Sequence, residues 1–265
     1  MKFKFDHDLH IHSFLSGCSK DPEQTPERMI RYAKENNLHT ICVTDHYWDS
    51  AVEGVHPWYA KANFDRISQS KPLPQADGIR FLFGCETEMR KDMTIGVPPE
   101  RYDDFDFIII PTTHWHILGY TIDESDHASI DIKARLWIEK LDALLSMDLP
   151  FHKVGFAHLL CQAISKTGRE EYLALINAIN GDEMARVFTK AAKLGVGIEL
   201  NKHDMSFSDE ETDIVLRPFR IAKACGCKFY LGSDAHKVKE LESVPKRFER
   251  IVELLDLQEE EKFMI

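Results

Sequence analysis

The sequence predicts an α/β protein in which helices cover a parallel β-sheet. Two observations carry this prediction. Short β-like runs alternate with helical stretches in seven steps along the 265 residues, an order typical of parallel sheets. Apolar runs such as FIII at 107–110 indicate strands that are buried on both faces. A chain of this length can form one large domain or two small ones, and α/β barrels of this size are commonly single domains. We therefore expect one domain over residues 1–265.

The first half of the chain contains four β-like runs. Residues 5–12 (FDHDLHIH) form the first run, and a helix follows in which Thr25 caps, Pro26 occupies the first turn and 29–37 continues. The second run, 39–46, is rich in β-branched residues. Residues 57–71, which have no clear pattern, lead to the third run at 79–89, and the fourth run is 103–114.

The second half contains three further β-like runs and five helices. The runs are expected at 151–160, 195–201 and 227–236. The helices are expected at 129–147, 170–178, 183–194, 213–225 and 245–255. We expect the last helix to end the fold, and the acidic segment QEEEK at 258–262 to be a solvated helix end.

Composition and charge narrow the class of protein. The hydrophobic fraction of 43% permits a sizeable core, and the net charge of −11 disfavours a grip on long nucleic acid. A small anionic substrate remains compatible, because bound cations can reverse the local sign of charge. No apolar run is long enough to span a membrane, and the first residues lack the apolar core of a signal peptide. Six scattered cysteines without a CxxC motif favour a reduced, cytoplasmic protein.

Histidines and acids gather where the predicted strands end. Because all strands of a parallel barrel end on one face, where active sites lie, these side chains are expected to meet. A lone histidine in a strand is usually structural, but six of the 13 histidines fall at strand ends. The residues, in strand order, are His10 and His12; Asp45 and His46; Glu86; His114, with His116 beyond it; His158; Glu199 and Asn201, followed by His203; and Asp234 with His236.

The first strand illustrates how the side chains are expected to point. A period of two sends Asp8, His10 and His12 toward the mouth of the barrel, while Leu9 and Ile11 pack outward under the helices. Imidazole and carboxylate ligands favour zinc, iron or manganese over calcium. The ligands are too many for one four-coordinate ion, so two or three ions are expected, with Glu86 as a bridge. Such a centre makes hydroxide at neutral pH and clamps phosphoryl oxygens.

The motifs together resemble a known family. DLHIHS, TDH, GCETEM, TTH, FAHLL and GSDAH, which begin at residues 8, 44, 84, 112, 156 and 232, are similar to the signatures of the PHP (polymerase and histidinol phosphatase) superfamily. The resemblance runs from residue 8 to residue 236. It implies a distorted (β/α)7 TIM-like barrel with two or three divalent metal ions (Zn, Fe or Mn).

The resemblance also implies a set of ligands. The first ion would take His10, His12, Glu86 and Asp234; the second would share Glu86 and take His114 and His158; the third would take His46 and His236. Cys18 stands eight residues after His10, where some members supply a histidine or aspartate. Its thiolate can bind zinc or iron, but Cys18 can equally be a neutral packing residue. Asp8 and Asp45, beside the ligands, are expected to orient an imidazole by accepting its N–H.

The leading functional hypothesis is a metal-dependent phosphoesterase that hydrolyses a small phosphate monoester through a metal-bridging hydroxide, as a histidinol-phosphate phosphatase does. His236, Asp234 and His203 are the candidate catalytic residues, with His236 or His203 protonating the leaving oxygen. The candidate substrate-binding residues are Lys202, Arg169, Lys237 and His116, the last of which can equally be an exposed loop residue.

Three alternatives stay open at this point. The first is a nucleotide or nucleic-acid phosphoesterase, although the net charge of −11 argues against long nucleic acid. The second is an amidohydrolase-like enzyme, which would usually carry a bridging lysine that the strand ends lack. The third is a non-catalytic, metal-binding regulatory module.

Overall fold

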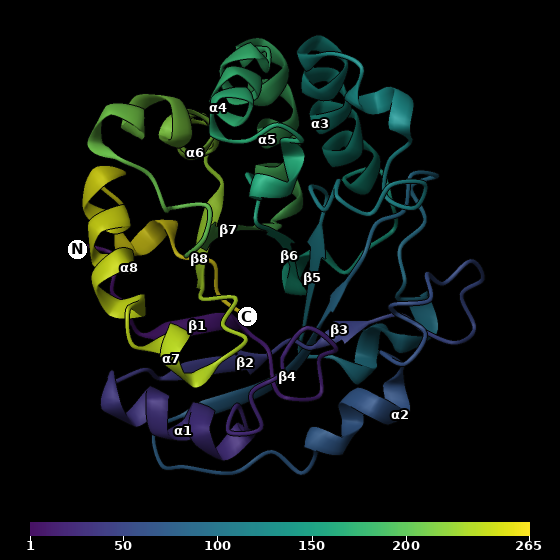
Figure 1. Ribbon diagram of the computed structural model, residues 1–265. Coiled ribbons are helices and arrows are strands. Elements are labelled where there is room, and N and C mark those ends of the chain that lie inside the picture. The colour runs from purple at the N-terminus through teal and green to yellow at the C-terminus, as the bar shows by residue number, and fades with distance from the viewer.

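The computed structural model describes residues 1–265, and its centre is a parallel sheet rolled into a nearly closed barrel (Figure 1). The sheet order is β1-β2-β4-β5-β6-β7-β8, and the short β3 pairs with β4. The prediction of a distorted (β/α)7 barrel is confirmed. The strands are β1 His7–Ile11, β2 Thr40–Val43, β3 His46–Tyr47, β4 Arg80–Thr87, β5 Phe107–Pro111, β6 Val154–Ala157, β7 Gly197–Asn201 and β8 Lys228–Gly232.

Helices surround the strands on the outside (Figure 1). They are α1 Pro26–Glu35, α2 Phe64–Ile67, α3 Ile130–Leu144, α4 Arg169–Ala178, α5 Gly181–Leu194, α6 Thr212–Ala224, α7 Val238–Leu241 and α8 Val244–Leu254. Most of the expected helix and strand boundaries agree with the structure within a few residues. The expected cap of α1 is also present, since the Thr25 hydroxyl accepts a hydrogen bond from Arg28 N at 3.3 Å. The short elements β3, α2 and α7 were not predicted, since two to four residues carry too little periodicity.

The barrel closes where β1 meets the chain that follows β8. The Asp234 N–H donates to the His10 carbonyl at 2.7 Å, and the His12 N–H donates to the Ala235 carbonyl at 3.1 Å. Farther down the seam, side chains replace backbone partners. Leu231 N donates to His7 Nε2 at 3.0 Å, and Ser233 N donates to Asp8 Oδ1 at 2.9 Å.

An irregularity in β1 overturns the expected facing of its side chains. The register with β2 shifts between Asp8 and Ile11, as at a β-bulge. Asp8 therefore contacts α1, where the Tyr32 hydroxyl donates to it at 3.1 Å, and Leu9 packs inside the barrel. The prediction that Asp8 faces the mouth and Leu9 faces the helices was wrong, because a strict period of two does not survive a bulge.

Apolar side chains form a large core between the sheet and the helices and a small core inside the barrel. The inner core contains residues of six strands together with Phe263 of the C-terminal segment: Leu9, Cys42, Leu82, Phe107, Ile109, Ala157, Tyr230 and Phe263. This inner core lies below the strand ends that carry the histidines.

The chain continues past α8 and closes the N-terminal end of the barrel. Phe263 is 5% exposed, and its N–H donates to the Phe229 carbonyl at 2.8 Å. Lys262 bonds both oxygens of Asp6 at 2.9 Å. Residues 258–262, which were expected to be a solvated helix end, instead contain a 3-10 turn at Glu259–Glu261. The residue that follows this turn, Lys262, is buried. The expectation that the last helix ends the fold was wrong.

Candidate metal centre

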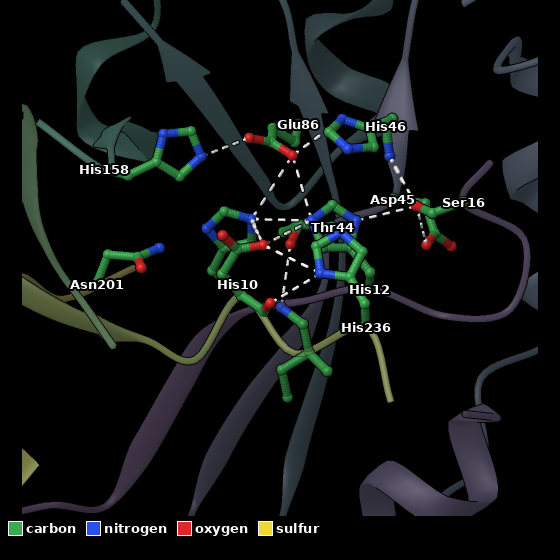
Figure 2. Close-up of polar contacts among 12 residues, drawn as sticks. His10, His12, Ser16, Thr44, Asp45, His46, Glu86, His158, Asn201 and His236 are labelled. Atoms are coloured by element: carbon green, nitrogen blue, oxygen red, sulfur yellow. Dashed lines mark hydrogen bonds and ion pairs between the residues drawn. The ribbon is translucent and has the colours of Figure 1, made fainter. Parts of the chain in front are cut away.

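Four donor residues from three places in the chain meet at the C-terminal end of the barrel. His10 and His12 come from β1 and the residue after it, Glu86 from β4, and Asp234 from the turn after β8. His12 Nε2 lies 3.2 Å from Glu86 Oε2 and 3.3 Å from Asp234 Oδ1. The corresponding distances from His10 Nε2 are 3.6 and 3.5 Å. Figure 2 shows these imidazoles gathered around the Glu86 carboxylate.

The Glu86 carboxylate is at the centre of the cluster and is 1% exposed. Its Oε1 faces His158 Nε2 at 2.9 Å, and its Oε2 faces His46 Nδ1 at 3.0 Å. Oε2 is nonetheless a buried oxygen without a hydrogen-bond partner. A buried carboxylate oxygen ringed by imidazole nitrogens fits a cation-binding site, so the donor set fits the divalent metal that the sequence predicts.

The electrostatics of the site also call for a cation. Burial would raise the pKa of Glu86, but His46 and His10 hold it well below its ordinary value. Burial would lower the pKa of His12, but the adjacent carboxylates of Asp234 and Glu86 raise it to about 9. The buried carboxylates therefore stay ionised and raise the pKa of the His10, His12 and His158 imidazoles, whereas burial lowers the pKa of His46. A divalent ion supplies positive charge while the imidazoles remain neutral ligands.

A second group of donors lies on one side of this cluster. Donor atoms of His12, Cys18, His46 and His236 all lie within 4.8 Å of one another. The rings of His12 and His236 stack with centroids 4.2 Å apart. The residues predicted for the third ion are therefore brought together, and Cys18 lies among them.

Two of the three residues predicted to bind the second ion, His114 and His158, lie together, but Glu86 is not grouped with both of them. His114 and His158 stack with centroids 4.5 Å apart, but Glu86 does not form a compact donor group with both of them. Instead, donor atoms of His114, His158 and Cys161 lie within 4.8 Å of one another. His114 Nδ1 contacts Glu88 Oε2 at 2.7 Å, which fixes the plane of the ring.

Hydrogen bonds behind the ligands orient the imidazoles. Glu199 Oε1 accepts from His10 Nδ1 at 2.7 Å, and Ser16 Oγ bonds His12 Nδ1 at 2.9 Å. Asp45 accepts from the Ser16 hydroxyl at 2.7 Å, so it acts on His12 through Ser16 and does not touch an imidazole itself.

Asp8 was predicted to orient an imidazole, and the structure does not support this role. The shifted register of β1 turns its carboxylate to Ser233 and Tyr32. Glu199 and Glu88 were missed as orienting residues. Their signal was present, since Glu88 follows Glu86 by two residues and Glu199 is an acid inside an apolar strand, but pairing each with its histidine requires the fold.

Two site residues have backbone angles that non-glycine residues rarely adopt. The φ angles are 24° at His158 and 50° at Asp234. Strained backbone of this kind concentrates at functional sites, where the surrounding structure holds it in place. At Asp234 the N–H bond to His10 is part of that surrounding structure.

Two cavities open on the metal centre and share His114, His158 and Asp234. The first, of about 550 Å³, is also lined by Trp58 and Leu118, which are 44% exposed. The second is about 310 Å³. His116, a predicted substrate contact, lines the first cavity, and His203, a predicted proton donor, lines the second. His236 and Cys18 also line the first cavity.

The three cations predicted to hold phosphate line neither cavity. Arg169 forms a two-pronged ion pair with Glu211 at 2.8 and 2.6 Å. Lys202 Nζ donates to the Glu240 carbonyl at 3.2 Å, and the exposed Lys237 lies 3.8 Å from the Glu240 carboxylate. Each of these cations contacts an acidic side chain or a carbonyl instead, and a role in holding phosphate stays a prediction.

Comparison with known proteins identifies the class. The PHP domain family matches residues 8–261, and the chain belongs to this family. Family membership and the clustered donor set confirm the expected class, a metal-dependent phosphoesterase. No curated protein matches the chain. No helix has the length and apolar character needed to cross a membrane.

Two solved structures share the fold. One is a histidinol phosphate phosphatase (HISK) of Lactococcus lactis subsp. lactis Il1403 complexed with zinc, L-histidinol and phosphate; the match has a TM-score of 0.62 and 14% identity and covers 98% of this chain and 99% of that one. The other is a proposed histidinol phosphatase, hisK, of Listeria monocytogenes, with a TM-score of 0.59, 14% identity and coverage of 88% and 96%. At this identity the likeness shows the fold alone.

Proposed function

We propose that the chain, as one domain over residues 1–265, hydrolyses a small phosphate monoester at this metal centre. The observation that carries the proposal is the buried Glu86 carboxylate, with its unpartnered oxygen, among four imidazoles from three strand ends. A cation site that opens on a cavity fits catalysis better than storage of metal.

The proposed ligands follow the grouping of the donors. His10, His12, Glu86 and Asp234 would hold one ion. His46, His236 and Cys18 would hold another, and His114 and His158 a third. Two or three zinc, iron or manganese ions fit this set. When bound, such ions supply an activated water and neutralise phosphate oxygens.

The remaining residues would bind the leaving group and move protons. His203 lines the second cavity, where its ring could protonate the leaving oxygen. His236, which lines the first cavity, could do so only where its ring does not hold an ion. The cavities offer no lysine or arginine, so the charge of the phosphate would be met by the ions and the imidazoles. This favours a single phosphate group over a polyphosphate.

The substrate proposal is a monoester of the histidinol phosphate type. Its support is the shared fold with the enzyme that binds L-histidinol and phosphate and the partly apolar first cavity, lined by Trp58, Ile117 and Leu118. No lysine or arginine lines the first cavity, and Glu88 lies behind its lining residue His114. An uncharged or cationic leaving group suits such a cavity.

The experiment is a panel of phosphate esters given to the zinc- or manganese-loaded protein. We expect phosphate release from histidinol phosphate and from p-nitrophenyl phosphate, and none from the diester bis-p-nitrophenyl phosphate. Glu86→Gln should reduce the release by at least about 100-fold, because it removes charge from the centre of the site, whereas Glu139→Gln on the exposed face of α3 should not change it. Faster hydrolysis of nucleotides or of the diester would instead support the nucleotide phosphoesterase alternative.

A further inference from the structure

We propose that Cys161 is a metal ligand, which completes with His114 and His158 a sulfur-containing site at one end of the metal centre. None of the motifs that indicated the metal centre includes this cysteine. The inference deepens the proposed function and rests on it, since it assigns a ligand at the same centre.

The local chain brings the thiol to the two histidines. Cys161 follows His158 by three residues, and its N–H donates to the His158 carbonyl at 3.1 Å, so a tight turn after β6 carries both side chains. Donor atoms of His114, His158 and Cys161 lie within 4.8 Å of one another. With metal–nitrogen and metal–sulfur bonds of roughly 2.0–2.3 Å, donors around one tetrahedral zinc ion lie about 3.3–3.8 Å apart. Small movements therefore suffice to close the site around an ion.

Both histidines have a ring nitrogen to spare for this site. His114 uses Nδ1 for Glu88 Oε2 at 2.7 Å, which leaves Nε2 without a protein partner. His158 is 3% exposed and its Nδ1 is buried without a hydrogen-bond partner, while Nε2 faces Glu86 at 2.9 Å. An unpartnered buried nitrogen costs free energy unless a ligand satisfies it.

The surroundings of Cys161 differ from those of the packing cysteines. Cys42, Cys85 and Cys227 belong to the apolar cores, where free cysteine acts as a small hydrophobic residue. Cys161 belongs to no apolar core and lines the second cavity beside His203. This placement favours a chemical role over a packing role.

A thiolate at this position would tune the choice of metal. As the ion binds, the thiol loses its proton to solvent and the sulfur becomes an anionic, soft ligand. Thiolate favours zinc and ferrous iron over manganese and magnesium. With Cys18 among the donors on the other side of Glu86, the centre would carry one sulfur at each end.

The test replaces zinc by cobalt(II), whose bonds to thiolate produce an intense near-ultraviolet charge-transfer absorption that imidazole and carboxylate do not produce. The starting protein is Cys18→Ser, so that the absorption reports only the remaining cysteines. We expect Cys18→Ser to keep the band, and Cys18→Ser/Cys161→Ser to lose it. Cys18→Ser/Cys225→Ser is the matched control, since Cys225 lies at the end of α6, and it should keep the band.

A second variant separates loss of the ligand from loss of the fold. Cys18→Ser/Cys161→His offers imidazole in place of thiolate, so it should bind as much cobalt as Cys18→Ser and yet lack the band; a misfolded protein would lose both. The proposal is overturned if Cys18→Ser shows no band, or if the band survives either substitution of Cys161. Phosphate release is measured separately: a protein with the band and without phosphatase activity would contradict the proposed function and leave Cys161 as a ligand.

Discussion

Individual residues decide the chemistry of the site, and the most informative are those behind the ligands. Glu199 accepts a hydrogen bond from His10 Nδ1 at 2.7 Å and another from the backbone N–H of His158 at 2.6 Å. It therefore fixes two ligands at once. Residues in this position keep the imidazole in the tautomer and orientation that binds metal.

We expect Glu199→Gln to weaken zinc binding by roughly 10–100-fold, the range for residues that orient metal ligands. Titration against a chromophoric chelator measures the affinity. Glu210→Gln, on an exposed turn, is the control and should bind zinc like the unchanged protein. Unchanged affinity in a folded Glu199→Gln protein would mean that the His10 ring is held by other contacts.

At this scale the sequence predicted the ligand types well and their partners poorly. Histidines at strand ends could be predicted as ligands because the fold brings every strand end to one face. The misplaced residues depend on features that spacing does not encode: a bulge turns Asp8 outward, and Glu211 engages Arg169.

At the scale of elements, the C-terminal segment is the part of the fold that the sequence concealed. Residues 258–262 have the sequence of a charged tail, yet they place Phe263 at the N-terminal end of the barrel. There the centroid of its ring lies 5.9 Å from that of Phe107. A Cβ on Gly197 would approach the Phe263 ring to 2.9 Å, so the absence of a side chain there makes room for the aromatic ring.

Removal of this aromatic ring should destabilise the barrel without touching its chemistry. We expect Phe263→Ala to lower the free energy of unfolding by about 3 kcal/mol, the low end for buried Phe→Ala changes. Denaturant titration measures this loss, and Met264→Ala, at a side chain 73% exposed, should change little. The zinc content should match the unchanged protein, since the segment lies at the opposite end of the barrel; lost zinc in a folded variant would contradict this separation.

The ion pair that anchors the same segment should depend on pH. Burial would raise the pKa of Asp6, but hydrogen bonds from His7 and Lys262 lower it to about 2, below the roughly 3.9 of an unfolded aspartate. A depressed pKa stabilises the fold fully above that unfolded value, and the contribution is lost as pH falls toward 2. Asp6→Asn should therefore cost up to about 1 kcal/mol at pH 7 and less at pH 3. A cost that is equal at both pH values, measured by urea unfolding, would exclude this linkage.

At the scale of the whole molecule, the metal centre joins strand ends that are far apart in the chain. β1, β4, β6 and the turn after β8 each supply a donor, so bound ions cross-link the open face of the barrel. Alternation of strands and helices predicted this architecture from the sequence, because the pattern is repeated seven times. The closure of the barrel was less accessible, since it relies on the side chains of His7 and Asp8 at the seam.

Removal of the ions should lower global stability. An ion that binds only the folded state contributes about 2.7 kcal/mol when its concentration is 100 times its dissociation constant. We therefore expect chelation to lower the melting temperature and zinc to restore it. In Glu86→Gln the response to zinc should be greatly reduced, and an equal response in both proteins would place the stabilising ion elsewhere.

The most direct measurement of the proposed centre is anomalous diffraction from crystals of the zinc-loaded protein, recorded at the zinc edge. We predict at least two anomalous peaks at the mouth of the barrel, one of them within bonding distance of His10 Nε2, His12 Nε2 and the carboxylates of Glu86 and Asp234. Crystals that contain zinc elsewhere or nowhere, with Glu86 still ringed by free imidazoles, would contradict the metal centre and with it the proposed hydrolysis.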